Sequence, residues 1–291
     1  MAAATVAFAV LDTTAKYLVT TEGIGAGQVT WLRFVTHVLF SLIVLWPFAF
    51  KPSLRSKKPG QQILRSMAMV LTTALNFIAL KYLQLDQTIT IFFLTPLLVA
   101  ALAGPLLGEW VGWHRMMAIC VGFAGVLIVM RPGFGGIHWA VTLSFGAMAG
   151  FALYNISTRY LAAFDPPEVT QTYSPLAGVV LMPPFAIAEW QWPDDPFTWL
   201  LFLSLGVWGG LGHWLLILAH RWAPAPVLAP FIYLGLIWMS FFGYLLFADV
   251  PTWWTLAGGA VVILSGLYLF ARERKALGPG AVGPASDIAT Q

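Results

Sequence analysis

A carboxylate and an ammonium group stand four residues apart in an otherwise apolar stretch near the start of the chain. Asp12 and Lys16 lie within residues 8–18, and a spacing of four places both on one face of a helix. Such a pair can hold a charged ligand, exchange a proton or neutralise itself. We expect an ion pair between the two side chains, which either fixes this helix or belongs to a binding site. Coupling to protons stays open.

A second polar stripe follows, in which Thr30, Arg33, His37 and Ser41 recur every three or four residues. That spacing places them along one side of a helix. Arg33 could bind a substrate, or its long side chain could reach water at the helix end. His37, like His213 further along, could bond to a neighbouring helix or take part in binding.

Other candidates are polar or aromatic side chains that interrupt apolar stretches. Thr and Asn residues in such places more often link helices than bind ligands, and aromatic rings could stack on a planar ligand. The candidate residues for substrate binding or gating are Asp12, Lys16, Arg33, His37, Asn76, Thr88, Tyr173, Trp208, His213 and Trp238.

The elements that hold these residues are membrane spans, because 59% of the 291 residues are apolar and only 9% are charged. About 20 residues cross the hydrocarbon layer. A charged group facing lipid at mid-span costs ~2.5–3.5 kcal/mol, so Asp12, Lys16 and Arg33 should face the interior. Apolar runs predict ten helical spans, at about 2–20, 28–49, 62–82, 87–107, 113–131, 137–160, 169–189, 197–219, 225–247 and 252–271.

The chain reads as a duplicated unit. Residues 8–18 resemble residues 151–161, with Asn155 and Arg159 in place of Asp12 and Lys16. At a shift of 140, Glu109 corresponds to Asp249, and Tyr173 replaces Arg33. Five spans are an odd number, so the second unit must face the opposite way, as in secondary transporters. We therefore predict an all-α integral membrane protein of two inverted five-helix repeats, 1–133 and 134–275.

Lys and Arg residues gather in the loop after the second span and behind the last span, which predicts cytoplasmic termini. The expected location is the plasma membrane, in bacteria the inner membrane. Residues 276–291 are rich in Gly, Pro and Ala and are expected to be a disordered tail. The first span begins late relative to its copy, so we expect a short segment before Met1.

Several motifs resemble the EamA branch of the drug/metabolite transporter superfamily. They are Trp31-Leu-Arg-Phe34, Leu80-Lys-Tyr-Leu83, Gly108-Glu-Trp-Val111 and the Gly-rich Val121-Gly-Phe-Ala-Gly-Val126. The resemblance covers about residues 1–275. It implies a transporter of a small metabolite such as an amino acid, a nucleotide-derived compound or a vitamin.

The motifs of other function classes are missing. The sequence has no His-Glu-x-x-His, no Gly-x-Ser-x-Gly and no phosphate-binding Gly-Lys-Thr/Ser. An enzyme is thus the least expected class, while a channel or a non-transporting receptor remains an alternative. Lys16 and Arg33 outnumber Asp12, which favours a carboxylate-bearing or zwitterionic substrate, with a planar ring as a further option. We expect no metal, no cofactor and no nucleic-acid partner, and a monomer or homodimer in the lipid bilayer.

Overall fold

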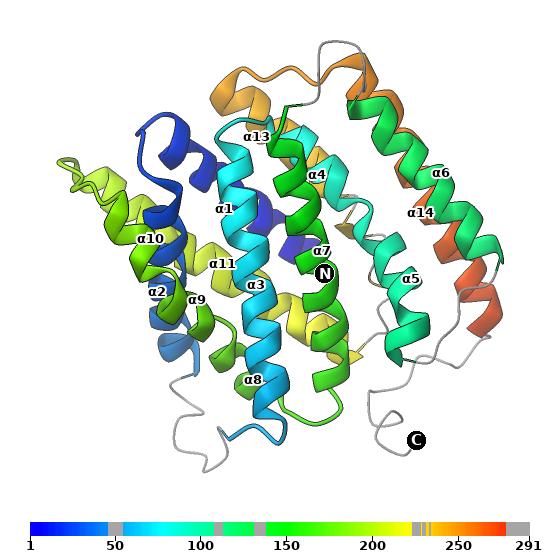
Figure 1. Cartoon of the computed structure of the whole chain (residues 1–291), viewed down its shortest axis with the longest axis horizontal. Helices are drawn as coiled ribbons and strands as arrows, with labels where there is room; N and C mark the ends of the chain where they lie inside the picture. Colours follow the sequence, from blue (N-terminus) through cyan, green and yellow to red (C-terminus); the bar gives the residue numbers. More distant parts are fainter. Residues whose placement is uncertain are drawn as a thin grey trace.

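The computed structural model describes residues 1–45, 55–107, 113–130, 138–222, 228, 231–232 and 234–277. Over these ranges the regular secondary structure is helical, and none of it is strand. The expected repeat boundary at 133/134, the start of the ninth span, Glu109 and the tail beyond residue 277 lie outside the described residues. The helices form one bundle (Figure 1).

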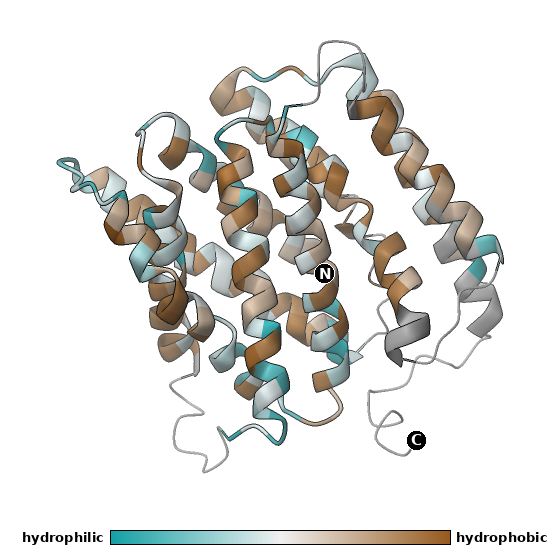
Figure 2. Ribbon diagram, viewed as in Figure 1, coloured by the Kyte–Doolittle hydropathy of each residue, from teal (hydrophilic) through white to brown (hydrophobic). Residues whose placement is uncertain are grey.

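Five helices are long and apolar enough to cross a membrane, in the part of the chain that the structure describes. They are α1 (Ala2–Thr20), α2 (Ala26–Leu45), α3 (Pro59–Leu80), α7 (Ala140–Leu161) and α11 (Pro196–Trp222). Figure 2 shows hydrophobic residues along the helices and hydrophilic residues toward their ends and turns. Large apolar side chains on the outer face of α3, such as Leu64 and Leu71, are about half exposed. An apolar outer surface of this extent suits contact with lipid rather than water.

Two of the expected spans are interrupted at prolines. The span expected at 87–107 is divided into α4 (Leu85–Phe92) and α5 (Thr95–Leu107), with Pro96 just after the break. The span expected at 169–189 consists of α8 (Pro167–Tyr173), α9 (Leu176–Leu181) and α10 (Pro183–Ala188). Proline has no N–H to donate and clashes with the preceding turn, so a helix ends or bends there.

The remaining apolar helices are α6 (Trp113–Met130), α13 (Leu234–Phe247) and α14 (Trp253–Leu277). Helices α6 and α14 lie side by side (Figure 1). Their contact is close because a Cβ atom at Gly258 would lie 2.4 Å from the carbonyl oxygen of Gly125. Glycine at both positions lets the two backbones touch.

The two halves of the chain are interleaved. Helix α1 of the first half packs against α11 of the second, and α3 of the first half packs against α7 of the second. Figure 1 shows α3 and α7 next to each other. The space where these pairs meet therefore draws its walls from both halves.

Candidate functional site

A cavity lies between α1, α2, α3, α4, α7, α11 and α13. The space within it that the centre of a water molecule can occupy is about 90 Å³, which is room for several water molecules. Most of its wall is apolar, with the aromatic rings of Phe8, Phe92 and Phe151. A mostly apolar cavity with a few polar groups is the usual form of a small-molecule site.

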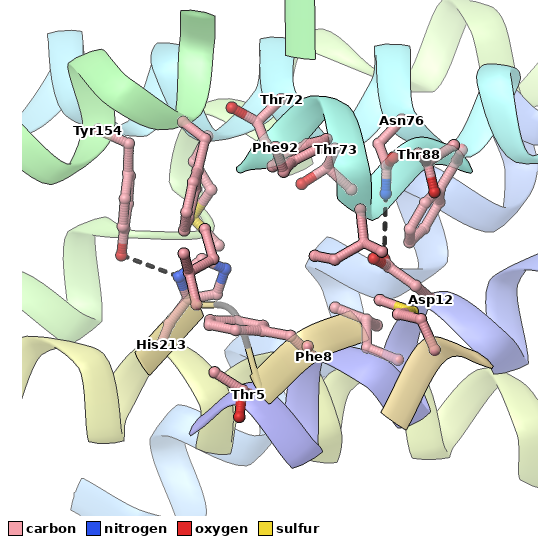
Figure 3. A pocket seen from close by; sticks show the side chains of 18 of the residues that line it. Thr5, Phe8, Asp12, Thr72, Thr73, Asn76, Thr88, Phe92, Tyr154 and His213 are labelled. Carbon is pink, nitrogen blue, oxygen red and sulfur yellow. Dashed lines mark hydrogen bonds between the residues drawn. The ribbon is translucent and has the colours of Figure 1, made fainter. Parts of the chain in front are cut away.

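One end of the cavity carries a carboxylate. Asp12 of α1 accepts a hydrogen bond from Nδ2 of Asn76 on α3, at 3.1 Å. Thr88 of α4 lies at the same end, as Figure 3 shows. Three helices thus bring polar groups to this end, and a ligand there would meet hydrogen-bond acceptors and one formal negative charge.

Arg33 of α2 also lines the cavity. Its side chain is 0% exposed, and none of its three guanidinium nitrogens has a hydrogen-bond partner among the described residues. The guanidinium lies 4.4 Å from the centre of the Phe34 ring, and a Cβ atom at Gly209 of α11 would be 3.2 Å from its Nε. It is thus turned into the protein, away from the helix end. Its five N–H donors are suited to an acceptor that is not part of the described structure.

The opposite end of the cavity carries Tyr154 of α7 and His213 of α11 (Figure 3). The Tyr154 hydroxyl is 2.9 Å from Nδ1 of His213. The ring of His37 stacks on that of His213, with 5.9 Å between centroids, and Nε2 of His37 lies 2.8 Å from Nε2 of Gln171. His37 therefore supports the cavity wall from behind, and His213 is part of the wall itself.

Arg65 of α3 anchors this end from the outside of the cavity. It donates to the Tyr154 hydroxyl, to Oγ1 of Thr158 at 2.7 Å and to Oγ of Ser174 at 3.0 Å. The arginine is fully buried, and its donors are matched with acceptors from α7 and the α8–α9 junction. Two buried arginines thus differ in kind: Arg65 is bonded and structural, while Arg33 is unbonded and faces the cavity.

Comparison with known proteins identifies the family to which this chain belongs. The model of the EamA-like transporter family matches residues 1–131 and again residues 138–272. The chain belongs to the EamA-like transporter family. The two matches cover the two halves, so this EamA protein is a membrane transporter built from two repeats, and it is not an enzyme.

Similar proteins include transporters of small metabolites. The chain is 28% identical to the riboflavin transporter of Vibrio cholerae, over 94% of this chain and 93% of that one. It is 27% identical to the S-adenosylmethionine uptake transporter of Rickettsia felis, over 91% of this chain and 89% of that one. A solved crystal structure with 17% identity superposes with a TM-score of 0.67 over 95% of this chain and 99% of that one, which supports the fold.

The expected ion pair between Asp12 and Lys16 in this EamA transporter is wrong. Nζ of Lys16 lies 2.6 Å from Oδ2 of Asp249, in the turn between α13 and α14, and Asp12 bonds to Asn76 instead. The ammonium group also lies 4.6 Å from the centre of the Phe247 ring. Local spacing could not reveal this pair, because its partners are 233 residues apart in sequence.

The candidate residues divide into two groups. Five of them line the cavity, and these are Asp12, Arg33, Asn76, Thr88 and His213. The other five, which are Lys16, His37, Tyr173, Trp208 and Trp238, do not line it. Trp208 and Trp238 pack instead against a buried apolar cluster around α1.

Tyr154 and the four phenylalanines of the wall, Phe8, Phe77, Phe92 and Phe151, were missed by sequence reasoning. The only signal for Phe8, Phe151 and Tyr154 was their place in or beside the duplicated segments 8–18 and 151–161. Among the described residues no group of three or more His, Cys, Asp or Glu side chains gathers where a metal ion could bind.

Proposed function

We propose that this EamA transporter carries a small polar metabolite with a planar ring, and with a carboxylate or zwitterionic character, by alternating access. The observation that carries the proposal is Arg33, a buried guanidinium in the wall of the cavity that is attracted by Asp12 but has no hydrogen-bond partner among the described residues. A buried charge without a partner is costly. A substrate acceptor that meets it would offset that cost, and an arginine fork matches a carboxylate through two hydrogen bonds.

A planar ring is supported by the aromatic wall. The rings of Phe8 and Phe151 are 6.4 Å apart and nearly perpendicular, and those of Phe92 and Phe151 are 5.8 Å apart. Aromatic faces and edges of this kind favour flat, polarisable ligands. Riboflavin and S-adenosylmethionine, after which the similar transporters are named, both contain a flat nitrogen-containing ring with polar groups attached.

Polarity at both ends of the cavity supports a substrate with donors and acceptors. Asp12 offers acceptor oxygens beside Asn76. Arg33 offers N–H donors, and the Tyr154 hydroxyl and the His213 ring can each donate or accept a hydrogen bond. A zwitterion, or a ring with N–H and C=O groups, matches such a distribution. A simple organic cation would leave Arg33 unmatched.

Transport requires the cavity to open to each side in turn, and we propose that two inverted five-helix repeats rock against each other. The duplication and the exchanged packing of α1 on α11 and of α3 on α7 support this proposal. Ten spans with both termini in the cytoplasm would give the two repeats opposite directions. In this proposal the rocking of the repeats also changes the size of the cavity, which in this structure leaves about 90 Å³ to the centres of water molecules.

The test is a thermal-shift screen of the purified protein against riboflavin, S-adenosylmethionine, adenosine, tryptophan and a simple quaternary ammonium ion. Compounds that raise the melting temperature are then assayed for saturable uptake into proteoliposomes. We expect a ring-bearing compound with an acceptor group to bind, and Arg33→Ala to weaken its binding. Binding of the quaternary ammonium ion alone would contradict the proposal.

A further inference from the structure

Asp86 is a buried carboxylate that neither the cavity nor the family match explains. It lies in the first turn of α4 and is 3% exposed. Neither of its carboxylate oxygens accepts a well-aligned hydrogen bond in the described part of the chain, although the backbone N–H groups of Asp86 and Gln87 at the start of α4 stabilise its charge. The helix dipole and these N–H groups of α4 favour a negative charge at that position, yet burial away from water disfavours it more strongly. Such a group is poised to accept a positive charge.

The charges around Asp86 do not balance. Lys16 and Asp249 form the ion pair described above, and Nε2 of Gln84 donates to Oδ1 of Asp249 at 3.4 Å. Asp86 interacts electrostatically with both members of that pair. One ammonium group thus serves two carboxylates, which leaves one excess negative charge in a largely buried cluster.

Other ionisable groups do not correct this imbalance. Helix α4 packs against α3, α6, α7, α13 and α14. Among the described side chains, the charges with the largest effect on Asp86 are those of Asp249, in the turn after α13, and Lys16 of α1. The nearest polar neighbours in sequence, Gln84 and Gln87, are neutral and form the N-terminal cap of α4.

We propose that Asp86 is the site at which this transporter takes up its coupling proton. Binding one proton to a carboxylate oxygen of Asp86 changes the charge of the Lys16–Asp86–Asp249 cluster from −1 to zero, and no covalent bond breaks. The cluster lies close to the cavity along two elements. Lys16 is one helical turn beyond Asp12 on α1, and Asp86 is two residues before Thr88 on α4.

Proton uptake would therefore act on α1 and α4, which are two of the three helices that carry the Asp12 end of the cavity. With Asp86 charged, the Lys16 ammonium group attracts the carboxylates of both Asp86 and Asp249. With Asp86 neutral, Lys16 is held by Asp249 alone, and α4 is free to move relative to α1 without separating opposite charges. This role rests on the proposed transport function, but the binding of the proton does not.

Binding is tested first, without any substrate, by melting the purified full-length protein at about pH 5, 6, 7 and 8. Removal of a buried charge that has no counter-ion of its own should stabilise, so we expect Asp86→Asn to melt higher than the wild type at about pH 8. That difference should shrink to nothing as the pH falls and Asp86 in the wild type takes up its proton. Asp194→Asn, which changes an exposed carboxylate between α10 and α11, is the matched control and should follow the wild type throughout.

A second variant covers the case in which Asp86→Asn does not fold. Asp249→Asn leaves one lysine for one carboxylate and removes the excess charge, so its melting temperature should also lose the extra pH dependence. Melting in NaCl and in KCl at equal ionic strength separates a proton from a sodium ion. If the curves of both variants parallel that of the wild type, or if stabilisation requires Na⁺, the proposal is overturned.

Coupling is tested by uptake of radiolabelled riboflavin into proteoliposomes, with and without an inward proton gradient. The wild type should be stimulated by the gradient, whereas Asp86→Asn should lose that stimulation and keep gradient-free exchange. Absence of riboflavin uptake in the wild type would count against riboflavin as the substrate, and the melting curves would still decide whether Asp86 binds a proton. Stimulation that survives in Asp86→Asn would refute the coupling role.

Discussion

Arg33 and Arg65 show how the same side chain can serve two purposes in one protein. Both are fully buried. Arg65 donates hydrogen bonds to Thr158, Ser174 and Tyr154, whereas Arg33 donates none to the described residues. Net stabilisation from a hydrogen bond to a charged group is about 1.5–3 kcal/mol. Among the described residues no atom supplies such a bond to Arg33, and in the proposed function the substrate supplies it.

Replacement of Arg33 should therefore weaken substrate binding more than it weakens folding. For an acidic substrate we expect Arg33→Ala to raise the half-saturation concentration roughly 10- to 150-fold, the equivalent of the lost charge-assisted bond. Arg33→Lys keeps the charge but loses the planar fork, and should have a smaller effect. Uptake kinetics in proteoliposomes measure both.

The matched control for Arg33 is Arg55→Ala, because Arg55 is exposed before the start of α3. It should leave uptake unchanged. If Arg33→Ala and Arg55→Ala behave alike at normal expression, the substrate does not contact Arg33.

Asp12 invites a different expectation, because its described partner is Asn76 rather than Lys16. Asp12→Asn keeps the size of the side chain and removes its charge, so we expect weaker binding of substrates that present N–H donors. The pH dependence of uptake should remain, since the proposed proton site is Asp86. Uptake measured between about pH 5 and 8 checks this. If Asp12→Asn alone gave a flat pH profile, Asp12 rather than Asp86 would be the proton-binding residue.

Polarity within apolar spans was enough to predict five residues of the cavity wall, including Asp12, Arg33 and His213. It was not enough to predict their partners. The Lys16–Asp249 pair depends on how α1 packs against the turn after α13, and no local spacing encodes that contact. Tyr154 and Phe92 were missed for a similar reason, because an aromatic residue in an apolar span gives no sign of whether it faces lipid, core or ligand.

At the scale of the elements, α11 carries a face of glycines that brings it close to its neighbours. A Cβ atom at Gly206 would lie 2.2 Å from the backbone carbonyl carbon of Thr36 on α2, and one at Gly212 would lie 2.6 Å from the ring of Phe8 on α1. These approaches place Arg33 and Phe8 at the cavity. The glycines of α11 thus position side chains that belong to other helices.

Gly206→Ala should consequently destabilise the protein, because backbone atoms of Thr36 cannot yield as a flexible side chain can. Overpacking of this kind costs about 1–3 kcal/mol, and we expect a lower melting temperature and reduced uptake. Gly60→Ala, at the exposed start of α3, is the control, since nothing lies within 4 Å of an added Cβ there. Equal melting temperatures for the two variants would mean that α2 and α11 are less tightly opposed than described.

Helix interruptions could be anticipated from the sequence more readily than their extent. A proline inside an apolar run marks a weak point of a helix, and breaks occur at Pro96 and Pro175. The division of residues 167–188 into three short helices also reflects the Pro183 position and the fit of α10 against α2. That fit is a tertiary contact, which periodicity does not contain.

At the scale of the whole molecule, composition alone predicted a multi-pass helical membrane protein, because nothing else accommodates so many apolar residues. The orientation of the bundle in the membrane is a separate expectation, which rests on the charges of its loops. It places Lys58, before α3, on the cytoplasmic side and Asp194, before α11, on the opposite side.

This orientation is checked by cysteine labelling in a Cys120→Ser background. A membrane-impermeant maleimide applied to intact cells should label Asp194→Cys and not Lys58→Cys. After the membrane is permeabilised, both should be labelled. The reverse pattern would invert the assignment of the termini, and labelling of both in intact cells would contradict the predicted number of spans between them.

The hydrogen bonds of Arg65 have a consequence for the way the protein is made. All its described side-chain partners, among them Tyr154 and Ser174, belong to the second repeat and are synthesised 89 or more residues later. At ~5–20 residues per second, α3 waits for roughly 5 to 20 s with an unmatched guanidinium, which its place near a helix end lets it keep in water. A ribosome that stops between the repeats leaves a first repeat in which α3 exposes a face, including Arg65, that is buried in the whole protein.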